Sequence, residues 1–300
     1  VSAGYEIRIF DDFSIGLQSR ITKFPDVVTA DVLDRESLVK AMAGVDSVIH
    51  LAAKKAVGES VDNPLKYYEN NFGGTLNILA AMKIAGVKKI VFSSTAAVYS
   101  PSEKPAITEE DSTIPLSPYG ATKLLSEQLI SNVSSAEGFS CVSLRYFNVA
   151  GSGSDEMGDN SRDNLVPKVF LAITNGERPE VFGTDYPTPD GTCIRDYIHV
   201  SDLARAHIDA LKAVEKSRID EIYNVGSGNG FSVTEVMTEI EKAMGKNLNP
   251  ILGPRRAGDS PKLIASIEKI SRDLGWKPKH TLRDMITSSW SAWQSQGGSR

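Results

Sequence analysis

Cysteine is scarce in this chain of 300 residues, which contains only Cys141 and Cys193. The two residues form no Cys-x-x-Cys pair and have no zinc-type companions, so we expect no metal site. So few cysteines without such a motif are typical of a reducing compartment, and we therefore expect a cytoplasmic protein.

Long apolar runs are also lacking. No run approaches the roughly 18 residues of a membrane helix, and residues 1–6 do not resemble a signal peptide. The formal net charge is −5 and no block of Lys and Arg occurs. These features argue against membrane and nucleic acid as partners. With 41% hydrophobic and 24% charged residues, the chain suits one or two domains with a full core.

Short apolar runs alternate with helical patterns along much of the chain. Such alternation predicts parallel strands joined by crossover helices, an α/β fold with a doubly wound Rossmann sheet. The runs lie at residues 6–10, 27–30, 47–51, 90–92, 142–146 and 222–225.

The alternation stops at residues 151–191, where Gly, Pro, Asp and Asn dominate and predict substrate-binding loops and short strands. An amphipathic segment at 282–293 closes a smaller region that follows Gly226. We therefore assign a Rossmann domain to residues 1–150, with a returning segment near 195–225. A smaller α/β substrate domain is assigned to 151–194 and 226–300.

A helix is predicted to begin near Pro64. Asn70 and Asn71 lie within it although asparagine is a poor helix former. Either both face solvent or one reaches into a polar site. The apolar side chains of this helix recur at three-to-four spacing along one face, at Leu65, Tyr68, Phe72, Leu76 and Leu79.

A group of residues typical of hydride transfer follows. Ser93, Ser94 and Thr95 close an apolar strand, and Tyr119 and Lys123 lie on the next long helix. Tyrosine and lysine four residues apart project from one helix face, so the ammonium can favour the phenolate and lower a pKa that starts at about 10. Tyr119 is then a general base, and Ser94 or Thr95 can bind the same substrate oxygen.

This spacing alone also occurs by chance on solvated helix faces. The strand that ends in hydroxyls and the proline-rich stretch at 101–118 favour the functional interpretation.

Of the two sequence features of a dinucleotide-binding site, the strand-end acid is present and the glycine-rich loop is not. Residues 6–12 form a predicted strand that ends in Asp11 and Asp12. A carboxylate there binds the adenosine ribose and selects NAD, although residues 12–16 also suit a turn. No glycine-rich pyrophosphate loop precedes it, and the glycines at 226, 228 and 230 are interpreted as a turn. Because the first strand of such a sheet is central, we expect about 20 to 30 further residues, a strand and a glycine turn, before Val1.

Together these motifs resemble the extended short-chain dehydrogenase/reductases. The resemblance runs from Gly4 to about Trp290. FGTDYPTPDGT at 182–192 narrows it to the sugar-nucleotide 4-epimerases of that family. The other segments that carry it are Asp11, HLAAKKAVGES at 50–60, SST at 93–95, Tyr119-x-x-x-Lys123, RYFN at 145–148, NLVP at 164–167 and RDYIHV at 195–200.

The resemblance implies NAD-dependent 4-epimerisation of a UDP-hexose, UDP-galactose to UDP-glucose, through a transient 4-keto sugar. Tyr119 would take the proton of the 4-hydroxyl, Thr95, with Ser94 beside it, would bind the 4-oxygen, and Lys123 would hold the nicotinamide ribose. The implied cofactor contacts are Asp11, Asp12, Asp31, Val32, Leu51, Ala52, Ala53, Lys55, Asn70, Ser93, Tyr119, Lys123 and Tyr146.

The resemblance also implies a homodimer and contacts for the UDP-sugar. Planar guanidinium groups suit phosphates, and this role falls to Arg195 and Arg256. Leu263 occupies the position whose bulk decides whether an N-acetyl group fits beside C2 of the sugar. The remaining substrate contacts are Thr95, Asn148, Asn164 and Leu165, with Phe182 at the uracil and Asp259 at the uridine ribose.

Alternatives remain open. A 4,6-dehydratase is disfavoured, because it needs an acid/base pair just after the strand-end threonine and Ala96 and Ala97 occupy those positions. A 4-epimerase of UDP-N-acetylhexosamine or another UDP-sugar is a closer competitor. A non-catalytic, N-terminally truncated dinucleotide-fold protein is favoured by the missing glycine loop and disfavoured by the tyrosine and lysine. His199 and His207 are predicted to be core residues rather than ligands.

Overall fold

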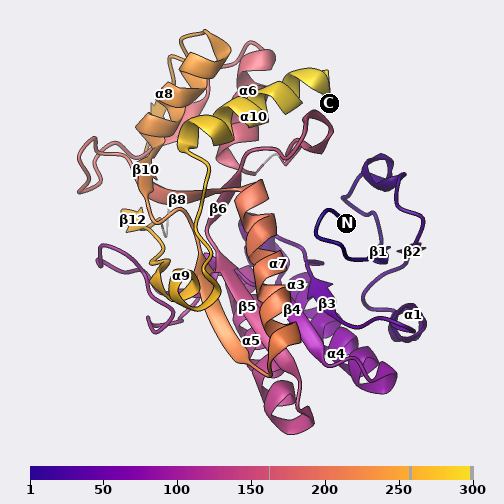
Figure 1. Cartoon of the computed structure of the whole chain (residues 1–300). Helices are drawn as coiled ribbons and strands as arrows, with labels where there is room; N and C mark the ends of the chain where they lie inside the picture. Colours follow the sequence, from indigo (N-terminus) through magenta and orange to yellow (C-terminus); the bar gives the residue numbers. More distant parts are fainter. Residues whose placement is uncertain (162, 257–258, 298–300) are drawn as a thin grey trace. The chain divides into compact units, whose positions relative to one another are not determined.

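The computed structural model describes residues 1–161, 163–256 and 259–297, and the chain divides into two compact units (Figure 1). The first unit comprises Val1–Ser100, Ser112–Arg145 and His207–Tyr223. The second comprises Pro101–Asp111, Tyr146–Ala206 and Asn224–Arg300.

The predicted strands form the sheets of the first unit. Strand β1 pairs in parallel with β2, and β3, β4, β5 and β9 form a four-stranded sheet in that order, in which β3, β4 and β5 are parallel. The fold-class prediction is confirmed, although β1 begins at Ile9 rather than at residue 6. The bounds are β1 Ile9–Asp11, β2 Val27–Thr29, β3 Val48–His50, β4 Lys89–Ser93, β5 Ser140–Tyr146 and β9 Asp220–Val225.

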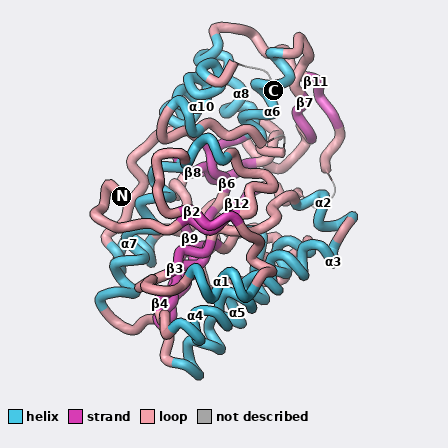
Figure 2. Tube along the Cα trace, turned by 90° about the vertical axis from the view of Figure 1, so that its right-hand side faces the viewer, coloured by secondary structure: helices cyan, strands magenta, loops and turns pink. Residues whose placement is uncertain are grey.

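The helices of this unit bury their apolar faces against these strands. Ile78 and Met82 of α4 and Ile130 of α5 belong to the same core as Ile90 and Phe92 of β4. Figure 2 shows α4 and α5 running side by side. The elements are η1 Gln18–Ile21, α1 Arg35–Ala41, α2 Val57–Asp62, α3 Pro64–Tyr67, η2 Tyr68–Gly73, α4 Gly74–Ala85, η3 Ala96–Val98 and α5 Pro118–Glu137. Helix α7 spans Val200–Lys216 and belongs to this unit from His207 onward.

The helix expected from Pro64 forms in three parts, because η2 between α3 and α4 is a π-helical turn. A π turn contains more residues than an α turn and therefore rotates the side chains that follow it. The predicted single apolar face is wrong for this reason. Leu65 and Leu76 are exposed, whereas Asn71, Thr75 and Leu79 are buried.

The second unit contains a small mixed sheet and a separate pair of strands. In the sheet, β8 has β10 antiparallel on one side and β12 parallel on the other, and β6 pairs in parallel with its last residues. Strands β7 and β11 form the parallel pair. The bounds are β6 Asn148–Ala150, β7 Glu180–Phe182, β8 Ile194–His199, β10 Gly230–Ser232, β11 Ile251–Gly253 and β12 Lys262–Leu263.

Helices α6, α8 and α10 supply the core of the second unit. Phe170 of α6 packs against Trp290 and Trp293 of α10. The segment predicted at 282–293 is confirmed as α10, but the expectation of only loops and short strands at 151–191 is wrong because α6 lies there. The bounds are η4 Asp155–Met157, α6 Leu165–Thr174, α8 Val233–Met244, α9 Glu268–Leu274 and α10 Leu282–Ser295.

Three further sequence-based expectations concern a glycine turn, the cysteines and membrane-spanning helices. Gly226 and Gly228 lie in the turn between β9 and β10, as predicted, whereas Gly230 is the first residue of β10. Cys141 and Cys193 are both free and buried. Among the described helices, none combines the length and apolarity that a membrane span requires.

Candidate active site

Helix α5 presents Tyr119 and Lys123 from its first turns. The Ser117 hydroxyl accepts a hydrogen bond from the Gly120 amide at 3.2 Å, and Pro118 occupies the first helical position. Tyr119 is 8% exposed and Lys123 is 2% exposed. The predicted helix and its start are therefore confirmed, and both side chains are buried.

The Lys123 ammonium has few protein partners. It donates a hydrogen bond to the Ser93 carbonyl at 2.8 Å and lies 4.8 Å from the centroid of the Phe92 ring. Burial lowers the pKa of Lys123 to about 7, and the negative charge of Glu127 opposes this shift. The side chain can therefore gain or lose its proton near neutral pH.

The three hydroxyls after β4 have different partners. Ser93 Oγ lies 2.7 Å from His207 Nε2, and Ser94 Oγ donates to the Glu127 carboxylate. Thr95 Oγ1 accepts a hydrogen bond from the Ala97 amide at 3.2 Å and thereby caps η3. Ser94 is thus engaged within the protein, whereas Thr95 keeps a hydroxyl proton that it can donate.

Helix α5 approaches the segment after Thr95 unusually closely at Gly120. A Cβ atom at this position would stand 2.3 Å from the Ala97 carbonyl oxygen and 2.9 Å from Pro115 Cβ. Glycine is therefore required for this contact, which holds the start of the tyrosine helix against the threonine segment.

The predicted cofactor contacts lie largely at the carboxyl ends of parallel strands. Asp11 ends β1, residues 51–53 follow β3, and Ser93 ends β4. Asp11 Oδ1 accepts the Phe13 amide at 2.7 Å and Asp12 Oδ1 the Ser14 amide at 2.9 Å. Both aspartates thus begin turns and both remain exposed. Their contact with the cofactor ribose remains a prediction.

Asn71, rather than Asn70, reaches into a polar site. Its side chain is 2% exposed, accepts the Lys54 amide at 2.8 Å and donates to the Lys54 carbonyl at 3.0 Å. It also donates to Thr122 Oγ1 at 3.3 Å. The loop after β3 is therefore fastened to η2 and α5. Asn71 was not among the predicted site residues, and the roles of Asn70 and Lys55 remain predictions.

Asp31 and Val32 are also placed locally. Asp31 Oδ1 accepts the Leu33 amide at 2.9 Å, so this carboxylate begins the turn before α1. Val32 is buried in the first core. Their contact with the cofactor remains a prediction.

The second unit brings several predicted substrate residues together. Arg195 forms an ion pair with Asp259 at 3.1 Å and donates to the Ser260 carbonyl at 2.8 Å. Leu263 lies opposite Arg195 in the register of β12 and β8. The Arg256 guanidinium lies 4.0 Å from the centroid of the Phe182 ring.

The other predicted contacts of this unit have local partners. Asn148 begins β6 opposite Tyr197 and is exposed. Asn164 donates to the Asp159 carboxylate at 2.6 Å. Leu165 packs against the second core, and Tyr146 is half-buried at the end of β5. Substrate or cofactor contact by these residues remains a prediction.

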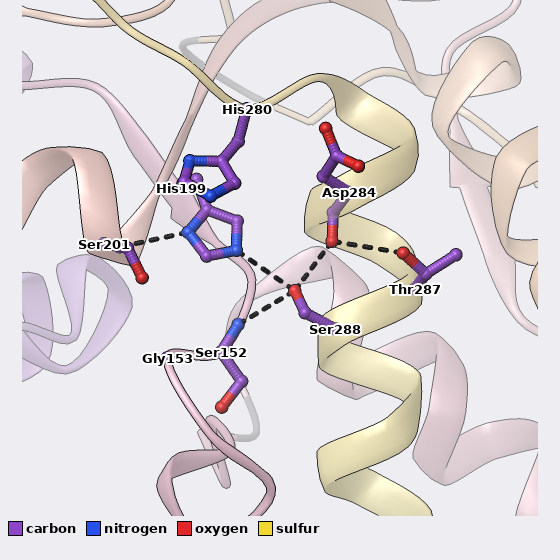
Figure 3. Close-up of a pocket in the computed structure, with 8 residues that line it drawn as sticks. All are labelled: Ser152, Gly153, His199, Ser201, His280, Asp284, Thr287 and Ser288. Carbon is purple, nitrogen blue, oxygen red and sulfur yellow. Dashed lines mark hydrogen bonds between the residues drawn. The ribbon is translucent and has the colours of Figure 1, made fainter.

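His199 lines a polar pocket of the second unit (Figure 3). Its Nδ1 accepts the Ser201 amide at 3.0 Å, so Nε2 carries the proton toward Ser288 Oγ at 3.1 Å. An imidazole that donates to a serine cannot deprotonate it, so this pair is no activated nucleophile. His199 is buried and stacks on His280 at 4.1 Å, consistent with a structural role.

Residues 1–226 match the NAD dependent epimerase/dehydratase family. The chain belongs to this family. The predicted resemblance is thereby confirmed.

Named relatives agree with this membership. The UDP-glucose 4-epimerase of Azospirillum brasilense is 43% identical over 300 residues, which cover 97% of this chain and 86% of that protein. The structure of UDP-glucose 4-epimerase from Bifidobacterium longum in complex with NAD+ and UDP has a TM-score of 0.90 at 38% identity, covering 98% of this chain and 92% of that one. The UDP-Glc/GlcNAc 4-epimerase of Campylobacter jejuni has a TM-score of 0.84 at 36% identity, covering 97% and 92%.

The family is NAD dependent, and the residues of the first unit fit this cofactor. An exposed carboxylate ends β1, a loop of small apolar residues follows β3, and a buried lysine lies on the helix of the tyrosine. A ribose diol, a flat ring system and a second ribose are the groups that such residues contact in a dinucleotide. Among the described residues, no cluster of His, Cys, Asp and Glu could hold a metal ion.

Proposed function

We propose that this protein interconverts UDP-galactose and UDP-glucose by inverting C4 of the hexose, with NAD as its resident cofactor. The observation that carries the proposal is the buried pair of Tyr119 and Lys123 on α5, docked through Gly120 against the segment of Thr95. Cofactor binding is assigned to the first unit and UDP-sugar binding to the second.

Three residues of the first unit have separate roles in the proton transfer. Tyr119 takes the proton of the sugar 4-hydroxyl and later returns one to the 4-oxygen. Thr95 donates a hydrogen bond to that oxygen, and the Lys123 ammonium favours the phenolate of Tyr119. When bound, NAD supplies reversible acceptance of the C4 hydride, so the sugar passes through a 4-keto form and the cofactor ends unchanged.

The second unit recognises the UDP group in this proposal. Arg195 and Arg256 offer planar donors to the two phosphates. Asp259 accepts from the uridine ribose, and the Phe182 ring stacks on the uracil. The ion pair of Arg195 with Asp259 supports this assignment because it holds the arginine in place before the substrate binds.

The decisive experiment is an assay of the purified protein with UDP-galactose as the sole sugar nucleotide. We expect UDP-glucose to form, as measured by chromatography, while the NADH absorbance shows no net increase. Net NADH formation would indicate a dehydrogenase, and loss of water from the sugar would indicate a dehydratase. Unchanged UDP-galactose in a protein that contains NAD would contradict the proposal.

A 4-epimerase of UDP-N-acetylhexosamines is the second candidate. The observation that favours it is the position of Leu263 beside Arg195 in the small sheet, because a leucine there leaves more room than a larger side chain. One of the similar proteins described above, from Campylobacter jejuni, is a UDP-Glc/GlcNAc 4-epimerase. The two candidates differ only in the sugars that the enzyme accepts.

We also propose that the protein is a cytoplasmic homodimer, on the basis of its free cysteines and of three exposed leucines on helices of the first unit. Leu65 is 82% exposed, Leu76 is 43% exposed and Leu125 of α5 is 37% exposed. Exposed apolar side chains on neighbouring helices are typical of association surfaces. Light scattering should give a dimer for the wild type and for Leu252→Lys in β11 of the second unit, where Leu252 is also exposed, and a monomer for Leu65→Lys/Leu76→Lys. A monomeric wild type would contradict this proposal.

A further inference from the structure

A buried ion pair lies beside the catalytic residues of the first unit. Glu127 follows Lys123 by one turn of α5, and Arg145 comes from β5. Both are 4% exposed. The arginine is bidentate, with Nε 3.0 Å from Oε1 and a terminal nitrogen 2.6 Å from Oε2.

The remaining groups of this pair contact both ends of one short segment. Ser94 Oγ donates to Glu127 Oε1 at the start of the segment. Arg145 donates to the Tyr99 hydroxyl at 3.0 Å at its end, and the guanidinium lies 4.9 Å from the centroid of the Tyr99 ring. Thr95 lies between these two anchors.

Stability alone does not explain a pair at this position. Replacing a buried ion pair with apolar residues of similar volume is often neutral or stabilising, because removing two charges from water is unfavourable. A bidentate arginine and carboxylate do, however, fix geometry in a way that apolar contacts cannot. The pair is better explained by the segment around Thr95 that it holds in place.

We propose that Glu127 and Arg145 are positioning residues that hold the Thr95 hydroxyl where it meets the sugar oxygen deprotonated by Tyr119. This inference rests on the proposed function. The pair acts on the segment from residue 94 to residue 99 as a clamp with two ends, so the loss of either charge releases Thr95. A misplacement of about 1 Å at a reacting group can reduce the rate by about 10²-fold.

The test compares single and double replacements. Glu127→Gln and Arg145→Met each leave one buried partner unpaired, so both Tm and kcat should fall. The double variant Glu127→Leu/Arg145→Met contains neither charge and should regain much of the Tm. Its kcat for UDP-galactose should remain at least about 30-fold below wild type, with KM changed less than about 3-fold.

The matched control lies on the same helix. Glu137 pairs with Lys83 at the exposed end of α5, and Glu137→Gln should leave kcat, KM and Tm at wild-type values. A double variant that regains kcat together with Tm would overturn the proposal, because the pair would then only support the fold.

A second measurement does not depend on turnover. In methyl-labelled protein, the Thr95 methyl resonance of the double variant should shift or broaden, whereas that of buried Thr75 in α4 should stay unchanged. An unmoved Thr95 resonance would overturn the positioning role even if the wild type proved inactive on every UDP-sugar. Wild-type inactivity with a displaced Thr95 would instead contradict the proposed function alone. If the double variant regains no Tm, the Thr95 resonance decides.

Discussion

Replacing Lys123 with methionine should make the protein more stable while removing most of its activity. The side chain is buried and its ammonium donates to the Ser93 carbonyl. Its pKa is lowered to about 7, whereas a lysine in water titrates at about 10.4, so the folded state disfavours the ammonium by about 4 to 5 kcal/mol. Methionine has a similar length and no charge.

The net effect on stability follows from two opposing contributions. Methionine removes the unfavourable burial of the charge but leaves the Ser93 carbonyl without its donor, which costs about 1 to 3 kcal/mol. At about pH 6.5 we therefore expect the free energy of unfolding to rise by about 1 to 4 kcal/mol.

The sign of the pH dependence provides a further check. The folded pKa of Lys123 lies below the unfolded value, so the unfolded chain binds more protons between about pH 7 and pH 10, and wild-type stability rises across that window. The advantage of Lys123→Met should therefore shrink and then vanish as the pH increases. Urea unfolding of nucleotide-free protein at about pH 6.5 and pH 9.5 measures both values.

The same variant should have a low kcat, and the acid limb of its pH profile should move to higher pH because the phenolate loses its neighbouring charge. A variant less stable than wild type at about pH 6.5 would refute this account of the buried ammonium.

Three further predictions follow from single side chains. Tyr119→Phe should lower kcat by about 10²-fold to 10⁴-fold while UDP binding by calorimetry stays near wild type; near-normal turnover would exclude Tyr119 as the base. If Leu263 leaves room for an N-acetyl group, the wild type should epimerise UDP-N-acetylglucosamine, and Leu263→Tyr should abolish that activity selectively; an equal drop in kcat/KM for both sugar types would rule this out. Burial lowers the pKa of His50 to about 3, so wild-type stability should decline from about pH 6.5 toward pH 3 by up to about 1.4 kcal/mol per pH unit. His50→Gln should reduce that decline, and an unchanged pH dependence would contradict the buried neutral imidazole.

The parts of the fold that depend on local pattern could be predicted from the sequence. Strands buried on both faces need continuous apolar runs, and β4 and β5 lie where such runs occur. Helix α6 was not predicted, because Pro167 and the surrounding Gly, Asp and Asn residues suggested loops. Proline in the first turn of a helix removes no intrahelical hydrogen bond, and the apolar run after Pro167 was the available signal.

The candidate site could likewise be predicted only where it depends on local spacing. Tyr119 and Lys123 could be predicted as a pair because their contact depends only on helical spacing. Glu127 continues that spacing by one more turn, which was a usable signal, but its partner Arg145 comes from a different strand. The Asn71 side chain is hydrogen-bonded to the backbone of Lys54, 17 residues earlier. Sequence spacing alone does not identify such partners, because tertiary packing brings them together.

The contact at Gly120 has a consequence for the entropy of the reaction. Side chains that pack against each other can exchange rotamers, and their separation then fluctuates. Here one main chain meets another, at Gly120 and Ala97, and neither has a side-chain rotamer to change at the point of contact. The spacing between the helix of Tyr119 and the segment of Thr95 is therefore established when the protein folds rather than when the sugar binds. Substrate binding needs to order the sugar and the nucleotide, but not the groups that transfer the proton.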